Sequence, residues 1–132
     1  MSAFFRSAAA IVTGAVLTIV LVSAATYLAI IVLLDPAPEG LIAYATPAFT
    51  VVSLGYALPS ALAGGWISAR LGGSHAGIHG ASVGILLLIP IVWGRGTTGP
   101  GQPGWYPWVF GAVTFVGAVT GAILWQRRWQ RE

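Results

Sequence analysis

The sequence predicts an all-α polytopic membrane protein, a bundle of four transmembrane helices with both termini on the cytoplasmic side. Composition is the first reason: 57% of the 132 residues are hydrophobic and 7% are charged, whereas soluble domains carry roughly 25% charged residues. The second reason is the presence of four long stretches without a charged side chain. The third is that five of the six arginines fall on one side of a four-span chain. Residues 1–132 are therefore expected to form one transmembrane domain.

The first predicted span covers residues 8–34, which exceeds the about 20 residues needed to cross a hydrocarbon core. Arg6 before an apolar run is also typical of a secretory signal, with residues 22–24 as a small-residue cleavage site. The apolar run continues for about ten residues beyond that site, which favours an uncleaved helix. The acidic, proline-containing stretch 35–40 is expected to end this helix as a short hairpin loop.

The second predicted span covers residues 41–69 and contains Pro47 and Pro59. Each proline removes a helical hydrogen bond, so we expect both to interrupt or kink the helix. Arg70 and the turn 71–74 are expected to close this span. Hydroxyl groups that could bond the freed carbonyls are those of Tyr44, Thr46, Thr50, Ser53, Tyr56 and Ser60.

The third and fourth predicted spans cover residues 75–94 and 105–126, each close to the minimum length for crossing a bilayer. Between them, residues 95–104 include four glycines and two prolines, which preclude regular structure. This segment is therefore expected to be a loop in water or at the membrane surface.

Arginine positions set the predicted orientation, because short cytoplasmic loops retain positive charge during insertion. The five arginines on the predicted cytoplasmic side are Arg6, Arg70, Arg127, Arg128 and Arg131. Arg95 falls on the opposite side with Asp35 and Glu39. Tryptophans favour the two membrane interfaces, and together with Arg70 they are the predicted interfacial anchors. Trp66, Trp125 and Trp129 fall at cytoplasmic helix ends, and Trp93, Trp105 and Trp108 at the other ends.

Small residues four apart predict where the helices pack, because association in lipid depends on close backbone approach. The predicted packing residues are Ala61, Gly64, Gly65, Ala76, Gly80, Gly84, Gly117 and Gly121, with Thr114 and Ala118 nearby. We interpret these rows as seams within a four-helix bundle. A glycine-lined pore or groove, or a dimerisation face, would use the same rows.

The spans contain little that predicts chemistry. All charged residues can be placed in loops, tails or helix ends, which argues against a proton-coupled pump. Serine and threonine hydroxyls in membrane helices usually bond their own backbone. The chain has no cysteine, no nucleophile motif and no basic stripe for nucleic acid. No enzyme activity and no cofactor are predicted.

His75 and His79 are the only candidate ligands for a metal ion or a haem, since residues four apart share one helix face. No carboxylate or cysteine lies near them in sequence, so no metal site is predicted. A pH-sensitive or headgroup-binding role is a second interpretation. A structural role, with interfacial water around both rings, is the third and the preferred one.

The stretch Gly64-Gly65-Trp66-Ile67-Ser68-Ala69-Arg70, followed by His79-Gly80 and Gly84, resembles a family of small uncharacterised bacterial four-helix membrane proteins. That family carries a Gly-Gly pair, a small-residue pair before a basic residue, and a His-Gly on the next helix. The resemblance implies a tight hairpin and a bacterial cytoplasmic membrane, and it implies no activity.

The sequence thus favours a structural or accessory membrane protein that packs with itself or within a larger membrane complex. The alternative is a minimal transporter or channel for an uncharged or small solute, with the second helix opened by its prolines. The lipid bilayer is the one partner that both interpretations share.

Overall fold

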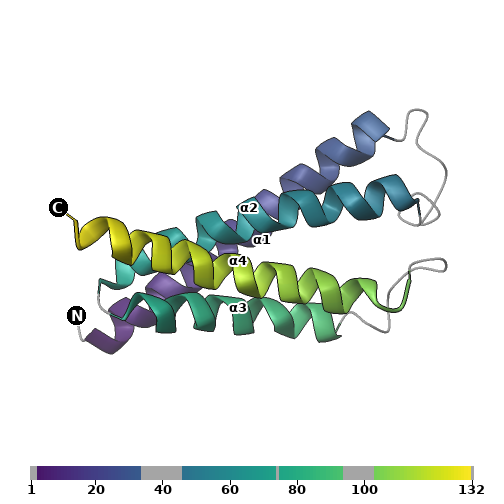
Figure 1. The fold of residues 1–132 in the computed structure, drawn as a ribbon. Coiled ribbons are helices and arrows are strands. Elements are labelled where there is room, and N and C mark those ends of the chain that lie inside the picture. The colour runs from purple at the N-terminus through teal and green to yellow at the C-terminus, as the bar shows by residue number, and fades with distance from the viewer. Residues whose placement is uncertain (1–2, 34–45, 74, 94–102, 132) are drawn as a thin grey trace.

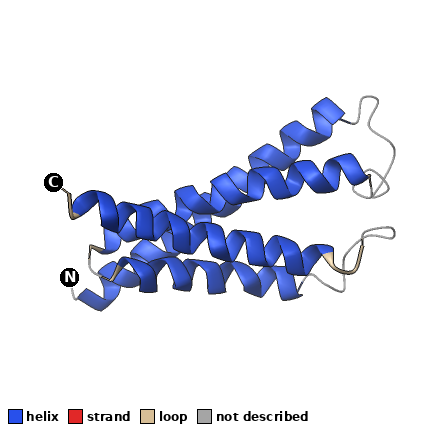
Figure 2. Ribbon diagram, viewed as in Figure 1, coloured by secondary structure: helices blue, strands red, loops and turns tan. Residues whose placement is uncertain are grey.

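A computed structural model describes residues 3–33, 46–73, 75–93 and 103–131. These residues form four α-helices that run up and down in turn (Figure 1). The helices are α1 (Ala3–Leu33), α2 (Pro47–Gly72), α3 (Ala76–Trp93) and α4 (Tyr106–Trp129). Figure 2 shows helix and short turns, with no strand among the described residues. All four helices are long and apolar enough to cross a bilayer, as predicted.

The bundle has two ends that differ in character. The end that carries Ala3, the turn between α2 and α3, and Trp129 is called the termini end here, and the opposite end the loop end (Figure 1). The predicted loop 35–40, and most of the predicted loop 95–104, lie outside the described residues, which exclude 34–45 and 94–102.

Helix α2 begins later than predicted, at Pro47 rather than near residue 41. The Thr46 side chain caps the helix by accepting a hydrogen bond from the Phe49 N–H at 3.2 Å. Proline in the first turn breaks no helical hydrogen bond, because its N–H would be unpaired there anyway. The expectation that Pro47 interrupts a helix is therefore wrong, while Pro59 does lie inside α2.

The other bounds differ from the prediction mainly at the termini end. Helix α1 already begins at Ala3 and α4 continues to Trp129, so the charged flanks are helical as well. Arg127 and Arg128 lie in the last turn of α4, where positive charge suits the helix dipole. Helix α3 contains Pro90, which the prediction of the third span did not take into account.

Helix α2 is the centre of the bundle. It packs most extensively on α1 and α4 and also contacts α3, whereas α1 packs mainly on α2 and less on α3. Contact is at backbone distance: a Cβ added to Gly65 would collide with the Ala118 carbonyl of α4. On the α1 side, a Cβ added to Gly14 would lie 2.6 Å from the Gly64 carbonyl oxygen. Glycine at these positions therefore sets the spacing of the helices.

Candidate functional site

The predicted packing residues all lie inside the bundle and face neighbours of the same chain. Buried in this way are Ala61, Gly64, Gly65, Ala76, Gly80, Gly84, Gly117 and Gly121. A Cβ on Gly80 would lie 2.7 Å from the Ala122 side chain, and one on Gly117 would lie 2.9 Å from the Ala61 side chain. Because the chain's own helices cover these rows, the glycines are not exposed as a dimerisation face.

The predicted anchors divide between the two ends as expected from the sequence. At the termini end, Trp66 and Trp125 pack edge to face with ring centroids 5.4 Å apart. The guanidinium carbon of Arg70 lies 5.8 Å from the centre of the Trp125 ring. Trp129 at this end, and Trp93, Trp105 and Trp108 at the loop end, are each more than half exposed.

The two histidines at the start of α3 have different surroundings. His75 is exposed and has a φ of 59°, which is uncommon for a residue other than glycine. Its carbonyl accepts hydrogen bonds from the N–H groups of Ile78 at 2.9 Å and His79 at 3.2 Å. His75 therefore starts the helix through its backbone, while its ring stays outside.

His79 is 4% exposed, so the expectation that interfacial water surrounds both rings is wrong for this residue. Its Nδ1 donates to the His75 carbonyl at 3.2 Å, which leaves Nε2 as an acceptor. The ring lies against Gly72, where a Cβ would collide with it, and Nε2 has no hydrogen-bond partner among the described residues. A metal ion on Nε2 would compete for the space next to Gly72.

Described His, Asp, Glu and Cys side chains form no group of three that could hold a metal. A second buried polar atom, the Ser68 Oγ of α2, also has no described partner, and a Cβ added to Gly14 of α1 would lie 2.7 Å from the Ser68 Cβ. Ser68 lies one helical turn before Gly72, on the same face of α2. The sequence includes Ser68 in the Gly64–Gly84 stretch but gives no sign that its hydroxyl is unpaired.

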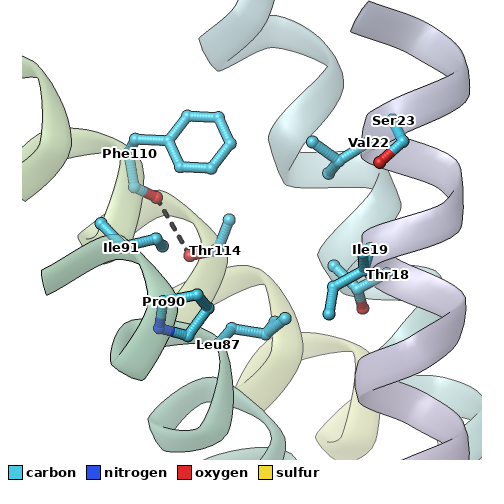
Figure 3. A pocket seen from close by; sticks show the side chains of 9 residues that line it. All are labelled: Thr18, Ile19, Val22, Ser23, Leu87, Pro90, Ile91, Phe110 and Thr114. Carbon is cyan, nitrogen blue, oxygen red and sulfur yellow. Dashed lines mark hydrogen bonds between the residues drawn. The ribbon is translucent and has the colours of Figure 1, made fainter. Parts of the chain in front are cut away.

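A groove opens between α1, α3 and α4, and Figure 3 shows its lining. This groove is lined by Thr18, Ile19, Val22, Ser23, Leu87, Pro90, Ile91, Phe110 and Thr114. It has a volume of about 120 Å³. Side chains of α1 form one wall, and those of α3 and α4 form the other.

Two of the hydroxyls in this groove are already used by the backbone. Thr18 donates to the Gly14 carbonyl at 3.0 Å. The Thr114 hydroxyl lies within hydrogen-bond distance of the carbonyls of Phe110 and Gly111, at 3.0 and 2.9 Å. Thr18 and Thr114 would therefore offer a guest in the groove hydroxyl lone pairs rather than free donors.

The groove is the part of the molecule that the sequence does not reveal. From the sequence, Thr18 and Ser23 fall only under the general expectation that hydroxyls in membrane helices bond their own backbone, and Thr114 is named only for its place near the packing rows. Pro90 is the available signal, because a proline in the middle of an apolar run marks a place where helix packing departs from a regular seam. It would not by itself have indicated the opposing wall on α1.

Two hydroxyl pairs join the helices nearer the loop end. Thr26 of α1 and Tyr56 of α2 have their oxygens 2.6 Å apart, and Ser53 of α2 and Tyr106 of α4 have theirs 2.7 Å apart.

Comparisons of the chain with protein-family models, curated proteins and solved structures find no match. The resemblance of the Gly64–Gly84 stretch to small bacterial membrane proteins therefore stays a prediction.

Proposed function

We propose that this chain is a multi-pass protein of the bacterial cytoplasmic membrane, with both termini in the cytoplasm. We further propose a structural or accessory role, in which the groove packs against a transmembrane helix of a second copy or of a larger membrane complex. The proposal is supported by four helices of spanning length and by large hydrophobic side chains on their outer faces.

The size of the groove is the observation that best supports the accessory role. Ligand pockets usually measure about 300–1,000 Å³, and this groove measures about 120 Å³. An apolar cavity of about 150 Å³ accommodates one benzene ring. The groove therefore matches one large side chain projecting from a neighbouring helix better than it matches a substrate.

A photo-cross-linking experiment tests this role. Because the chain has no cysteine of its own, a thiol reagent labels only the introduced one. A benzophenone maleimide is attached to Ser23→Cys in the groove or to Val116→Cys, which is 57% exposed and lies outside the groove, two positions after Thr114 on α4. We expect Ser23→Cys to yield one protein adduct, either a dimer or a defined heterocomplex, and Val116→Cys to yield mainly lipid adducts.

Filling the groove provides the second half of the test. Ile91→Trp added to Ser23→Cys should abolish the protein adduct, because the indole occupies the space that the partner side chain needs. Equal lipid adducts from both cysteines, or a monomer without any co-purifying protein after gentle extraction, would contradict the accessory role.

The proposed orientation has its own test at two open positions. Gly104→Cys at the loop end has free space around an added Cβ, and Gln130→Cys lies beyond α4 at the termini end. We expect an impermeant maleimide to label only Gly104→Cys in intact cells and only Gln130→Cys in inverted vesicles. The reverse pattern would invert the topology without affecting the accessory role.

A minimal transporter for an uncharged solute is the second candidate function. The loop ends of α1 and α2 diverge from those of α3 and α4 (Figure 1). The pairs Thr26–Tyr56 and Ser53–Tyr106 place hydroxyls in this region. Vesicles containing the chain should then take up glycerol or urea faster than empty vesicles, and equal rates would remove this candidate.

A further inference from the structure

A second hollow lies at the termini end, between the first turns of α1 and the last turn of α2. It measures about 360 Å³ and is lined by Arg6, Ala9, Ala10, Thr13, Arg70 and Leu71. The two arginines are 64 positions apart in sequence (70 − 6), and the antiparallel pairing of α1 and α2 brings both to this one place. A volume of this size falls at the lower end of the range for small-ligand pockets, about 300–1,000 Å³.

Each guanidinium is held by a contact that leaves most of its donors available. The Arg6 Nε donates to the Leu71 carbonyl at 3.0 Å. That carbonyl belongs to the last turn of α2, where helical partners are missing. Arg70 lies over the Trp125 ring of α4. An anion at this place would meet two cations that are already positioned, so little side-chain entropy would be lost on binding.

The hollow has positive charge without a described counter-charge. Neither arginine forms an ion pair with a carboxylate in the described part of the chain, because the three carboxylate residues, Asp35, Glu39 and Glu132, all lie outside it. Two cations that line one hollow repel each other, and an anion between them would remove that repulsion.

We infer that the hollow between Arg6 and Arg70 binds a phosphate group, either that of an anionic lipid headgroup or that of a soluble phosphate ester. The planar guanidinium fork matches the spacing of phosphate oxygens and makes paired, charge-assisted hydrogen bonds. Ala9, Ala10 and Leu71 add an apolar wall that suits the glycerol carbons of either source.

The surroundings favour the lipid source. Trp66, Trp125 and Trp129 lie at the same end of the bundle, and tryptophan prefers the headgroup level of a membrane. Under the proposed orientation this end faces the cytoplasmic leaflet, whose anionic lipids attract basic residues. The site is separate from the groove, so either proposal can fail while the other stands.

Lipid binding to the purified full-length chain tests the inference. Native mass spectrometry or a fluorescence titration would compare phosphatidylglycerol with phosphatidylcholine, in which a choline ammonium offsets the phosphate charge. Arg70→Gln should weaken phosphatidylglycerol binding about tenfold, the loss expected for hydrogen bonds to a charged group. The matched control is Arg131→Gln, which removes one exposed charge from the same end but does not line the hollow.

Arg70→Gln carries the test because Arg6 also bonds the end of α2. Glycerol 3-phosphate serves as the soluble arm: direct binding that depends on Arg70, and displacement of the lipid, would support the phosphate site and assign it to a soluble ester. Equal losses in Arg70→Gln and Arg131→Gln would overturn the inference. So would a chain that shows no preference for phosphatidylglycerol and no binding of glycerol 3-phosphate.

Discussion

Helices α1 and α2 lie side by side, yet they differ in opposite directions in hydropathy and in burial. Helix α1 contains the most apolar stretch of the four, and 11% of that stretch is buried inside the bundle. Helix α2 contains the least apolar stretch, and 44% of it is buried. In a water-soluble domain the more apolar helix would be the more buried one. The reversed order is what an apolar solvent such as lipid favours.

The residues at the centre of the bundle explain this reversal. The buried positions of α2 are Phe49, Thr50, Ser53, Ala57, Ser60, Ala61, Gly64, Gly65, Ser68 and Ala69, nearly all of them small or hydroxyl-bearing. Such residues gain little by leaving lipid, but they let backbones approach closely and pair their hydroxyls. Large side chains such as Ile19 and Leu28 of α1 stay outside instead. Close fit rather than apolar burial therefore holds α2 in place.

The largest expected effect is at Gly65, where the close fit of α2 is most demanding. Gly65→Ala places a methyl group against the Ala118 backbone carbonyl, which cannot rotate away. We expect a loss of about 2–3 kcal/mol in the free energy of unfolding, as for an overpacked core. Unfolding in a graded detergent mixture, followed by circular dichroism, measures the change.

Gly55→Ala is the matched control on the same helix, because nothing lies within 4 Å of a Cβ added there. It should leave stability unchanged or raise it by up to about 1 kcal/mol through helix propensity. Equal losses at Gly55 and Gly65 would mean that backbone flexibility, and not close approach, explains the glycines of α2.

The next effect tests whether the close fit continues into the turn between α2 and α3. Gly72→Ala places a methyl group against the His79 ring and should cost about 1–3 kcal/mol. In a His79→Ala background the same substitution should be nearly neutral, since the ring is gone. A double-mutant cycle measures the coupling. Additive losses would show that Gly72 is needed for the turn itself and not for the histidine.

A gain in stability is expected from Ser68→Ala. The Ser68 Oγ is buried without a described partner, so its removal should stabilise the protein by about 1 kcal/mol, the lower part of the usual cost of an unsatisfied buried group. The same detergent titration provides the measurement. A loss of stability would instead indicate that this hydroxyl has a hydrogen-bond partner in the folded protein, which would contradict the prediction.

The sequence predicts the helices well because a run without charges is a local property, visible without knowledge of neighbours. The sequence also contains a signal for the start of α2, since Thr46-Pro47 is a typical cap and first turn. The apolar residues before Thr46 hide this signal because they favour a longer helix. The groove and the burial of His79, in contrast, cannot be predicted from a local stretch of sequence. Both depend on which faces of neighbouring helices meet. The rotation of a helix has no local signal in Ser23 or His79, and Pro90 does not indicate the opposing wall on α1.

The smallest expected effect concerns a hydrogen bond between side chains of α1 and α2, that of Thr26 with Tyr56. Thr26→Val keeps the shape and removes this bond, which should cost about 0.6 kcal/mol, the average for such bonds between membrane helices. Thr13→Val is the control on the same helix, because the Thr13 hydroxyl bonds only the Ala9 carbonyl one turn before it. If the two variants lose equal stability in the detergent titration, the Thr26–Tyr56 bond does not hold the loop half of α1. Close packing such as that near Gly14, together with the Arg6–Leu71 hydrogen bond at the termini end, would then hold the most apolar helix, and the contrast with α2 would be sharper still.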